Sequence, residues 1–306
     1  MAESDDTADA AAPGVHEYWR GEALEGQEAL DVTQAVPARV VVVAGPAESG
    51  KTTLVAGLYE MFHRGPFGGH LFAGSRTLVG FERRCHLARR ASGLEAPDTE
   101  RTSRTSGQPM LHLRVRPPAG SEATDLLVTD IYGEAFRHAA DSTEECQRLG
   151  VLRRADHVAV LVDGARLASL KLRQQPFAEA DALLRSCEDA GMLDRTSQVQ
   201  VVVTKADLVR VGADAAARQK FVADKLGWIA ERHAGRLGLL TTFEVAVRPN
   251  PDSGLDPGHG LAPLFEAWVG RPRRAAEVRR AVRPAALHTE YDRFTRAWPA
   301  TPSAGD

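Results

Sequence analysis

Short apolar runs recur along the middle of the chain, and each predicts a buried β-strand. The clearest is residues 40–44, where four valines and an alanine follow one another. The other runs that we expect to form strands are residues 71–78, 125–130, 157–163, 199–204 and 241–247. Residues 110–116 instead alternate between apolar and polar side chains, as in a half-exposed strand, with His112 on the side that we expect to be solvated.

Apolar residues at helical spacing follow these runs. Leu54, Leu58 and Met61 predict a helix directly after the first strand. We expect further helices over residues 79–91, 177–191, 214–233 and 261–268. Strands that alternate with helices predict an α/β fold in three layers, with helices on both faces of a mostly parallel sheet and residues 110–116 as its one antiparallel strand. Ligands of such sheets bind at the carboxyl ends of the strands.

The segment GPAESGKT, residues 45–52, joins the first predicted strand to the first predicted helix. It fits the phosphate-loop pattern G-x-x-x-x-G-K-[ST] of P-loop NTPases. Glycines permit a loop whose backbone N–H groups turn toward an anion, and the helix dipole reinforces the attraction. We expect Lys51 to reach the β- and γ-phosphates and the Thr52 hydroxyl to bind Mg²⁺. The residues expected around the phosphates are Gly45, Glu48, Ser49, Gly50, Lys51, Thr52 and Thr53.

A second polar motif, TDIYGE at residues 129–134, ends the predicted strand 125–130. Asp130 leaves the sheet at a point where it can hold Mg²⁺ through water, and Gly133 can offer its backbone N–H to a γ-phosphate. The pattern D-x-x-G alone arises by chance in most proteins. Its position at the end of a buried strand, after a phosphate loop, is what gives it weight.

A third motif, VVVTKAD at residues 201–207, ends the predicted strand 199–204. Thr204, Lys205 and Asp207 follow the pattern [NT]-K-x-D. A carboxylate here can accept two hydrogen bonds from guanine, at N1–H and N2–H, whereas adenine presents no such donor pair. Lys205 would lay its apolar stem against the purine. Taken alone, the segment also fits a solvated turn before a helix, with Asp207 as a cap.

The composition is that of an ordinary globular chain, with 306 residues, 43% of them hydrophobic and 26% charged. We expect a disordered acidic tail over residues 1–36, a P-loop domain over residues 37–270 and an arginine-rich helical tail over residues 271–306. The net charge of −3 does not indicate nucleic-acid binding. No apolar run approaches the ~18 residues of a membrane span, and the N-terminus lacks a signal peptide, so we expect a cytoplasmic protein.

In this order, GPAESGKT, DIYGE and TKAD resemble the motifs of Ras-like GTPases of the translation-factor-related (TRAFAC) class. Finer stretches, among them GHLFAGSRTLVGFE, RTSRTSG and LVDGARL, look like the bacterial double-GTPase group that is associated with multi-gene conflict systems. The resemblance covers residues 39–269. It implies a Ras-like domain that binds GTP or GDP with Mg²⁺ and acts as a switch beside a protein effector or a second GTPase encoded nearby.

The resemblance also assigns residues where the motifs depart from the family pattern. The third base-side motif falls at Ala246, Val247 and Arg248, where a backbone N–H, from Val247, would contact guanine O6. Glu134 stands where a glutamine often orients the attacking water. A carboxylate there can accept a proton from water but also repels the γ-phosphate, so we expect hydrolysis to be slow without a partner.

The first switch threonine, a ligand of Mg²⁺, must lie in the loop before residue 110. We assign it to Thr105, with Thr102 as the fallback, and we consider Arg101 or Arg104 as an arginine finger in cis. Two other readings stay open: a P-loop ATPase or kinase, which would make no use of Asp207, and a pseudo-GTPase scaffold that binds nucleotide without turnover.

Overall fold

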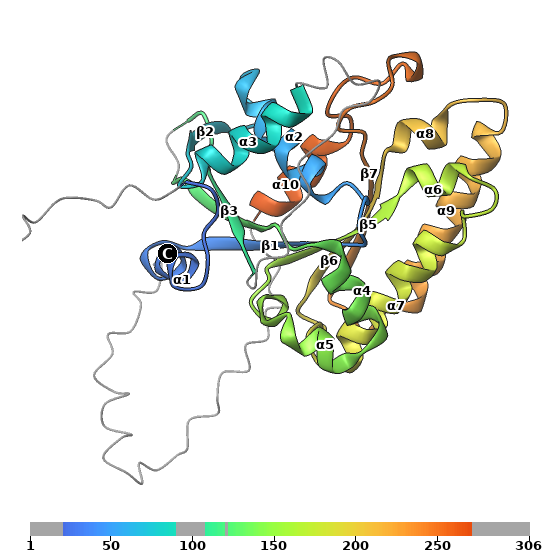
Figure 1. Ribbon diagram of the computed structural model, residues 1–306, viewed down its shortest axis with the longest axis horizontal. Helices are drawn as coiled ribbons and strands as arrows, with labels where there is room; N and C mark the ends of the chain where they lie inside the picture. Colours follow the sequence, from blue (N-terminus) through green and yellow to red (C-terminus); the bar gives the residue numbers. More distant parts are fainter. Residues whose placement is uncertain (1–20, 90–107, 120–121, 271–306) are drawn as a thin grey trace, which may run out of the picture. The chain divides into compact units, whose positions relative to one another are not determined.

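The computed structural model describes residues 21–89, 108–119 and 122–270. Its centre is a seven-stranded sheet with the strand order β2-β3-β4-β1-β5-β6-β7 (Figure 1). The strands are β1 (Ala38–Ala44), β2 (Leu71–Gly74), β3 (Met110–Arg116), β4 (Thr124–Thr129), β5 (His157–Asp163), β6 (Gln198–Thr204) and β7 (Leu239–Glu244). β3 pairs antiparallel with both β2 and β4, while β4, β1, β5, β6 and β7 pair in parallel. The predicted mostly parallel sheet with one antiparallel strand is therefore confirmed.

Helices cover both faces of the sheet (Figure 1). They are α1 (Gln27–Ala35), α2 (Lys51–His63), α3 (Leu78–Arg89), α4 (Gly133–Asp141), α5 (Thr143–Arg148), α6 (Gly164–Ala168), α7 (Gln175–Asp189), α8 (Ala206–Arg210), α9 (Ala215–Arg232) and α10 (Leu261–Val269), with short 3₁₀ turns at Gly150–Arg153 and Pro251–Ser253. Alternate residues of a strand point to opposite faces, so β1 supplies both cores. Val40 and Val42 pack in the core on the side of α1, α4, α7 and α9. Val41 and Val43 pack on the side of α2, α3 and α10.

The N-terminal region differs from the prediction. Residues 21–36 were expected to belong to a disordered tail, but they contain α1 and a short bridge to β3. The N–H of Leu24 donates to the Met110 carbonyl at 2.8 Å, and the Met110 N–H donates back at 2.9 Å. Leu24, Ala29 and Val32 are buried. These few apolar residues are enough to order an acidic segment, because the backbone of β3 also offers it hydrogen-bond partners. Residues 1–20 and 271–306 lie outside the described residues.

His112 also differs from the prediction, because it is buried rather than solvated. Its Nε2 lies 2.8 Å from the Asp125 carboxylate, and its Nδ1 accepts a hydrogen bond of 2.9 Å from the Arg76 backbone N–H. Burial lowers the pKa of His112, although Asp125 acts to raise it. A neutral ring that donates from Nε2 and accepts at Nδ1 satisfies both contacts.

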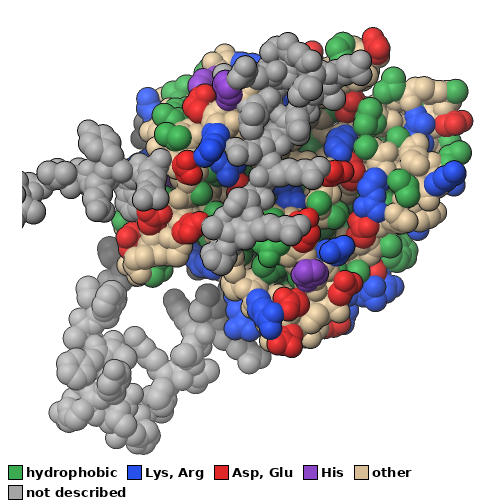
Figure 2. Space-filling model, viewed as in Figure 1, with side chains coloured by type: hydrophobic (Ala, Val, Ile, Leu, Met, Phe, Trp, Pro, Cys, Tyr) green, Lys and Arg blue, Asp and Glu red, His purple; other side chains and the backbone are tan. Residues whose placement is uncertain are grey.

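On the face shown in Figure 2, basic and acidic side chains are interspersed, as expected for a chain whose net charge is −3. Within the described ranges, no helix combines the length and the apolar character needed to cross a membrane.

Candidate functional site

The loop between β1 and α2 has the backbone geometry that the phosphate-loop pattern predicts. Gly50, at the N-terminus of α2, has a φ of 91°, in the left-handed region that favours glycine. A Cβ at Gly45 would lie 2.8 Å from Ser49 Oγ, so the loop closes tightly on itself. Ser49 Oγ donates to the Pro46 carbonyl at 2.9 Å. The first N–H groups of α2 have no partner within the helix, and a helix N-terminus of this kind suits an anion.

Lys51 is folded back onto this loop. Its side chain is buried, and Nζ donates to the carbonyls of Gly45 at 3.0 Å and Pro46 at 2.8 Å. Burial lowers the pKa of Lys51 from 10.5 to about 8, while the negative charges of Asp130 and Glu134 act to raise it. The ammonium therefore makes contacts with carbonyl oxygens that a phosphate can replace.

The D-x-x-G motif lies directly against the phosphate loop. Asp130 follows β4, is 3% exposed, and donates its backbone N–H to Pro109 at 2.8 Å. Gly133 begins α4, and a Cβ there would lie 2.1 Å from the Ala47 backbone nitrogen. Only glycine allows so close an approach of two backbones. Glu134 is half-buried in the first turn of α4, and its charge acts on Lys51.

The oxygen donors at this edge suit Mg²⁺ bound together with phosphates. Within the described part of the chain, no group of three or more His, Cys, Asp or Glu side chains is placed to hold a metal alone. Mg²⁺ commonly takes only one or two protein ligands and completes its shell with water and phosphate oxygens. The Thr52 hydroxyl and the Asp130 carboxylate are oxygen donors of this kind, and a cationic group, the Arg84 guanidinium, already contacts Asp130. Thr105 and Thr102, like Arg101 and Arg104, lie outside the described residues.

The T-K-A-D segment bonds to the phosphate loop across the sheet edge. Thr204, the last residue of β6, donates from Oγ1 to the Ser49 carbonyl at 2.8 Å. Lys205 has a φ of 48° and directs its Nζ to the Glu48 carbonyl at 2.8 Å and to the Asp163 carboxylate at 3.0 Å. These bonds hold the two loops together at the carboxyl ends of β1, β5 and β6, where the sequence predicted them to meet.

Asp207 is 5% exposed and accepts a hydrogen bond of 3.1 Å from the backbone N–H of Asn250. Asn250 belongs to the loop after β7, which also carries the third base-side motif. Ala246 donates its N–H to the His259 carbonyl at 3.0 Å, so this donor is already used and is not offered to a base. Val247 packs its side chain against α2, where a Cβ at Gly57 would lie 2.1 Å from Val247 Cγ1.

Four residues with structural roles at the site were not singled out from the sequence as site residues: Arg84, Asp163, Gly164 and Asn250. Asp163 ends β5, and its buried carboxylate pairs with Lys205. A Cβ at Gly164 would lie 2.2 Å from the Thr204 carbonyl, so this glycine lets α6 approach the T-K-A-D segment. The signal for both was present, because D-G at 163–164 directly follows a buried strand that ends at the same edge.

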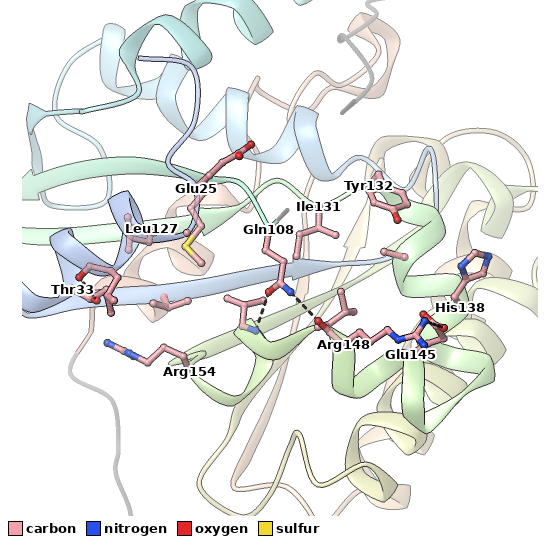
Figure 3. Close-up of a pocket in the computed structure, with 18 residues that line it drawn as sticks. Glu25, Thr33, Gln108, Leu127, Ile131, Tyr132, His138, Glu145, Arg148 and Arg154 are labelled. Carbon is pink, nitrogen blue, oxygen red and sulfur yellow. Dashed lines mark hydrogen bonds and ion pairs between the residues drawn. The ribbon is translucent and has the colours of Figure 1, made fainter. Parts of the chain in front are cut away.

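A separate cavity of about 1040 Å³ lies beside the D-x-x-G motif, on the side of the sheet that carries α1 (Figure 3). Ile131 and Tyr132 line it, as do residues of α1 and α5. Gln108 crosses it and bonds to the Arg148 carbonyl and the Val151 N–H, each at 3.0 Å. Among the described residues, none of the lysines, threonines and aspartates predicted to contact nucleotide lines this cavity, so it is distinct from the loops described above.

Comparisons with known proteins give one family match and distant structural likenesses. No curated protein matches the chain. Among solved structures, the signal recognition particle receptor SRb from Chaetomium thermophilum has a TM-score of 0.42 and 17% identity, over 75% of this chain and 98% of that one. The Ski7 GTPase-like domain of S. cerevisiae has a TM-score of 0.45 and 11% identity, over 78% of this chain and 52% of that one.

At these TM-scores the structural likenesses carry no argument about function, and the assignment depends on the sequence match. The model of the Double-GTPase 2 family matches residues 39–269 of the 306-residue chain, which is the region from β1 to the end of α10. The matched region contains all three motifs and the contacts between them. The chain belongs to the Double-GTPase 2 family of P-loop GTPases.

Proposed function

We propose that the chain is a Mg²⁺-dependent switch that binds GTP, hydrolyses it slowly on its own and acts with a partner protein. The observation that carries the proposal is the direct bonding between the T-K-A-D segment and the phosphate loop, from Thr204 to Ser49 and from Lys205 to Glu48. A ligand that fills both loops needs a base at one end and phosphates at the other. Membership of a GTPase family supports guanine as that base.

Recognition of the base falls to Asp207. Its carboxylate is buried, and one oxygen accepts the Asn250 N–H, which orients the group and leaves acceptor positions for guanine N1–H and N2–H. Adenine lacks this donor pair, and a buried carboxylate left without donors costs free energy. Lys205, fixed by Asp163, would lie along the purine, and the Val247 backbone is the donor that we assign to guanine O6.

Binding of the phosphates falls to Lys51 and the backbone N–H groups from Glu48 to Thr53. Lys51 would exchange the carbonyls of Gly45 and Pro46 for phosphate oxygens, which are stronger acceptors because they are charged. Thr52 and Asp130 would hold Mg²⁺, which when bound neutralises charge on the β- and γ-phosphates. Gly133 would offer its N–H to the γ-phosphate and so report whether that group is present.

Hydrolysis depends on the residue that faces the attacking water. We assign this position to Glu134, whose charge acts on Lys51 in the structure. A carboxylate there can take a proton from water, but it also repels the γ-phosphate, so turnover is slow until a partner supplies a compensating charge. The threonine that closes over Mg²⁺ stays assigned to Thr105. The partner class that we propose is an effector or a second GTPase.

Competition for a fluorescent guanine nucleotide tests the proposal. GTP, GDP and ATP are each titrated against the bound probe, with Mg²⁺ and with EDTA, for the wild type and for Asp207→Ala. We expect GTP and GDP to displace the probe at concentrations at which ATP does not. We expect Asp207→Ala to weaken the binding of both guanine nucleotides by roughly a hundredfold, the loss of two hydrogen bonds to a charged group.

Asp214→Ala is the matched control, because Asp214 is exposed and lies outside the motifs. It should bind all three nucleotides like the wild type. Equal competition by ATP would instead identify a P-loop ATPase. Binding of GTP without phosphate release, even with a large excess of protein over nucleotide, would identify a scaffold that does not hydrolyse.

A further inference from the structure

An arginine outside every predicted motif contacts the carboxylate that we expect to hold the metal. Arg84, in α3, directs Nε to Asp130 Oδ2 at 2.9 Å, and its Nη2 contacts the same oxygen. Its remaining nitrogen, Nη1, donates to the Gly80 carbonyl at 2.9 Å. The exposed fractions of the two side chains are 15% for Arg84 and 2% for Asp130. All three guanidinium nitrogens are thus engaged in a mostly buried contact.

The burial of Asp130 explains why a cation is needed there. A carboxylate removed from water is costly unless it is paired and hydrogen-bonded. Lys51 is close enough for Asp130 to raise its pKa, but its Nζ donates to the loop carbonyls instead. Arg84 is therefore a direct partner of Asp130.

We propose that Arg84 is a positioning residue that holds Asp130 in the metal-free site and must release it before Mg²⁺ binds. The inference depends on the proposed function, because it takes Asp130 as a residue that holds Mg²⁺. The guanidinium and a hydrated Mg²⁺ are both cationic donors to the Asp130 carboxylate, so the two compete for it. Arg84 keeps the carboxylate oriented when the site is empty and raises the Mg²⁺ concentration at which the metal enters.

The release is a movement of the Arg84 side chain rather than of the helix. The neighbouring residues of α3 are fixed to α2: the ring of Phe81 stacks on Tyr59 with centroids 4.7 Å apart, and Cys85 Sγ donates to the Ala56 carbonyl at 3.3 Å. The arginine side chain is long and 15% exposed, so it can turn toward solvent while α3 stays in place.

A Mg²⁺ titration of the protein with bound fluorescent GDP tests the inference. The release rate of the nucleotide is measured from EDTA to millimolar Mg²⁺, and the midpoint gives the apparent affinity for the metal. For Arg84→Met we expect the midpoint to fall to a roughly tenfold lower Mg²⁺ concentration, since a competing hydrogen-bonded charge has been removed. The GDP affinity in EDTA should stay as in the wild type.

Arg83→Met is the matched control, because Arg83 precedes Arg84 in α3 but pairs with Glu22 at 2.8 Å, and its side chain is 55% exposed. It removes the same charge without touching Asp130 and should leave the midpoint unchanged. An unchanged midpoint in Arg84→Met overturns the inference. So does a weaker GDP affinity in EDTA with an unchanged midpoint, which would assign Arg84 to the phosphates.

Arg84→Met removes the guanidinium from the buried Asp130 carboxylate, and this loss can prevent folding. Arg84→Lys then decides the question, because it retains a charge near Asp130 but loses the two-nitrogen contact. If the Mg²⁺ midpoint of Arg84→Lys lies below that of the wild type, the inference is supported. If the midpoint equals that of the wild type, the inference is overturned. If the folded wild type bound no guanine nucleotide, the proposed function would fail and this inference with it. GDP binding with equal midpoints in all variants would remove the inference alone.

Discussion

The two sides of the candidate site are prepared for ligand to different degrees. On the base side, Thr204 and Lys205 already bond to the phosphate loop, and Asp207 is already oriented by Asn250. On the phosphate side, the cationic groups are occupied by other parts of the protein. Lys51 donates to loop carbonyls, and Arg84 takes the place next to Asp130. On the base side, protein contacts hold the motif residues in place. On the phosphate side, protein groups contact Lys51 and Asp130, the residues that we expect to bind phosphate and metal.

This difference suggests an order of events. Under the proposed function, the base would bind to a T-K-A-D segment that is already held in place, so little ordering cost should oppose its binding. The phosphates and the metal would first displace protein groups, which lowers their net contribution and makes it depend on which nucleotide binds. A change on the base side should therefore weaken GDP and GTP alike, and a change on the phosphate side should affect GTP more.

Gly133→Ala is the strongest test on the phosphate side. The new Cβ would lie 2.1 Å from the Ala47 nitrogen and 2.5 Å from the Pro46 carbonyl carbon, and backbone atoms cannot give way cheaply. We expect GTP affinity to fall on the order of a hundredfold, with a smaller loss for GDP, as the γ-phosphate loses a charge-assisted hydrogen bond. Titration with fluorescent GDP and GTP analogues measures both.

Gly227→Ala controls for the substitution itself, because a Cβ at Gly227, within α9, meets no atom within 4 Å. It should leave both affinities unchanged and raise stability by up to about 1 kcal/mol through helix propensity. Wild-type GTP affinity in Gly133→Ala would show that the close approach to the phosphate loop has no part in sensing the γ-phosphate.

Lys205→Met tests the base side. Methionine keeps an apolar stem for the purine but removes the ammonium that joins Glu48 and Asp163. We expect GDP and GTP affinities to fall together by about tenfold, the worth of one hydrogen bond between charged groups, with their ratio unchanged. Lys220→Met removes an exposed lysine that pairs with its helix neighbour Asp224, so it is the control. A loss confined to GTP would break the distinction between the two sides.

On the base side, the sequence predicts the T-K-A-D segment but misses Asp163, Gly164 and Asn250, which contact it from other parts of the chain. The residues of the T-K-A-D segment itself lie in one short motif at the end of one strand, so local pattern and the sheet rule together place them. The P-loop and the D-x-x-G motif are local in the same sense, and the fold places them together as predicted. The role of each of these residues toward a nucleotide stays a prediction.

Arg84 could not be found in this way. It belongs to no motif, and its contact with Asp130 depends on how α3 packs against α2, a tertiary arrangement that spacing along the chain does not encode. The ordered residues 21–36 escaped prediction for a related reason. Their composition is that of a tail, and the backbone partner of Leu24 is Met110, at the end of β3 that β2 does not pair with. The sequence predicts side chains that act within one segment better than side chains that act across segments.

The two ends of β5 also differ. Its last residue, Asp163, pairs with Lys205 on the base side, and its first residue lies at the opposite edge of the sheet, where the pH dependence of stability can be measured. Its first residue, His157, is 1% exposed, and within the described residues its Nε2 has no hydrogen-bond partner. Burial lowers the pKa of His157 to about 4, with Asp156 acting against the shift and Arg39 adding to it. The folded protein therefore keeps this ring neutral where the unfolded chain protonates it.

Because the unfolded chain binds more protons between about pH 6.5 and pH 4, stability should fall as the pH falls through this window. At about pH 5.5 we expect His157 to account for a loss of about 1 kcal/mol relative to neutral pH. Urea unfolding of the wild type and His157→Gln at both pH values isolates this residue, because His112 stays in both proteins. Nucleotide affinity measured at neutral pH should be equal in the two. A variant that loses stability with pH as steeply as the wild type would mean that the folded protein admits the proton at His157.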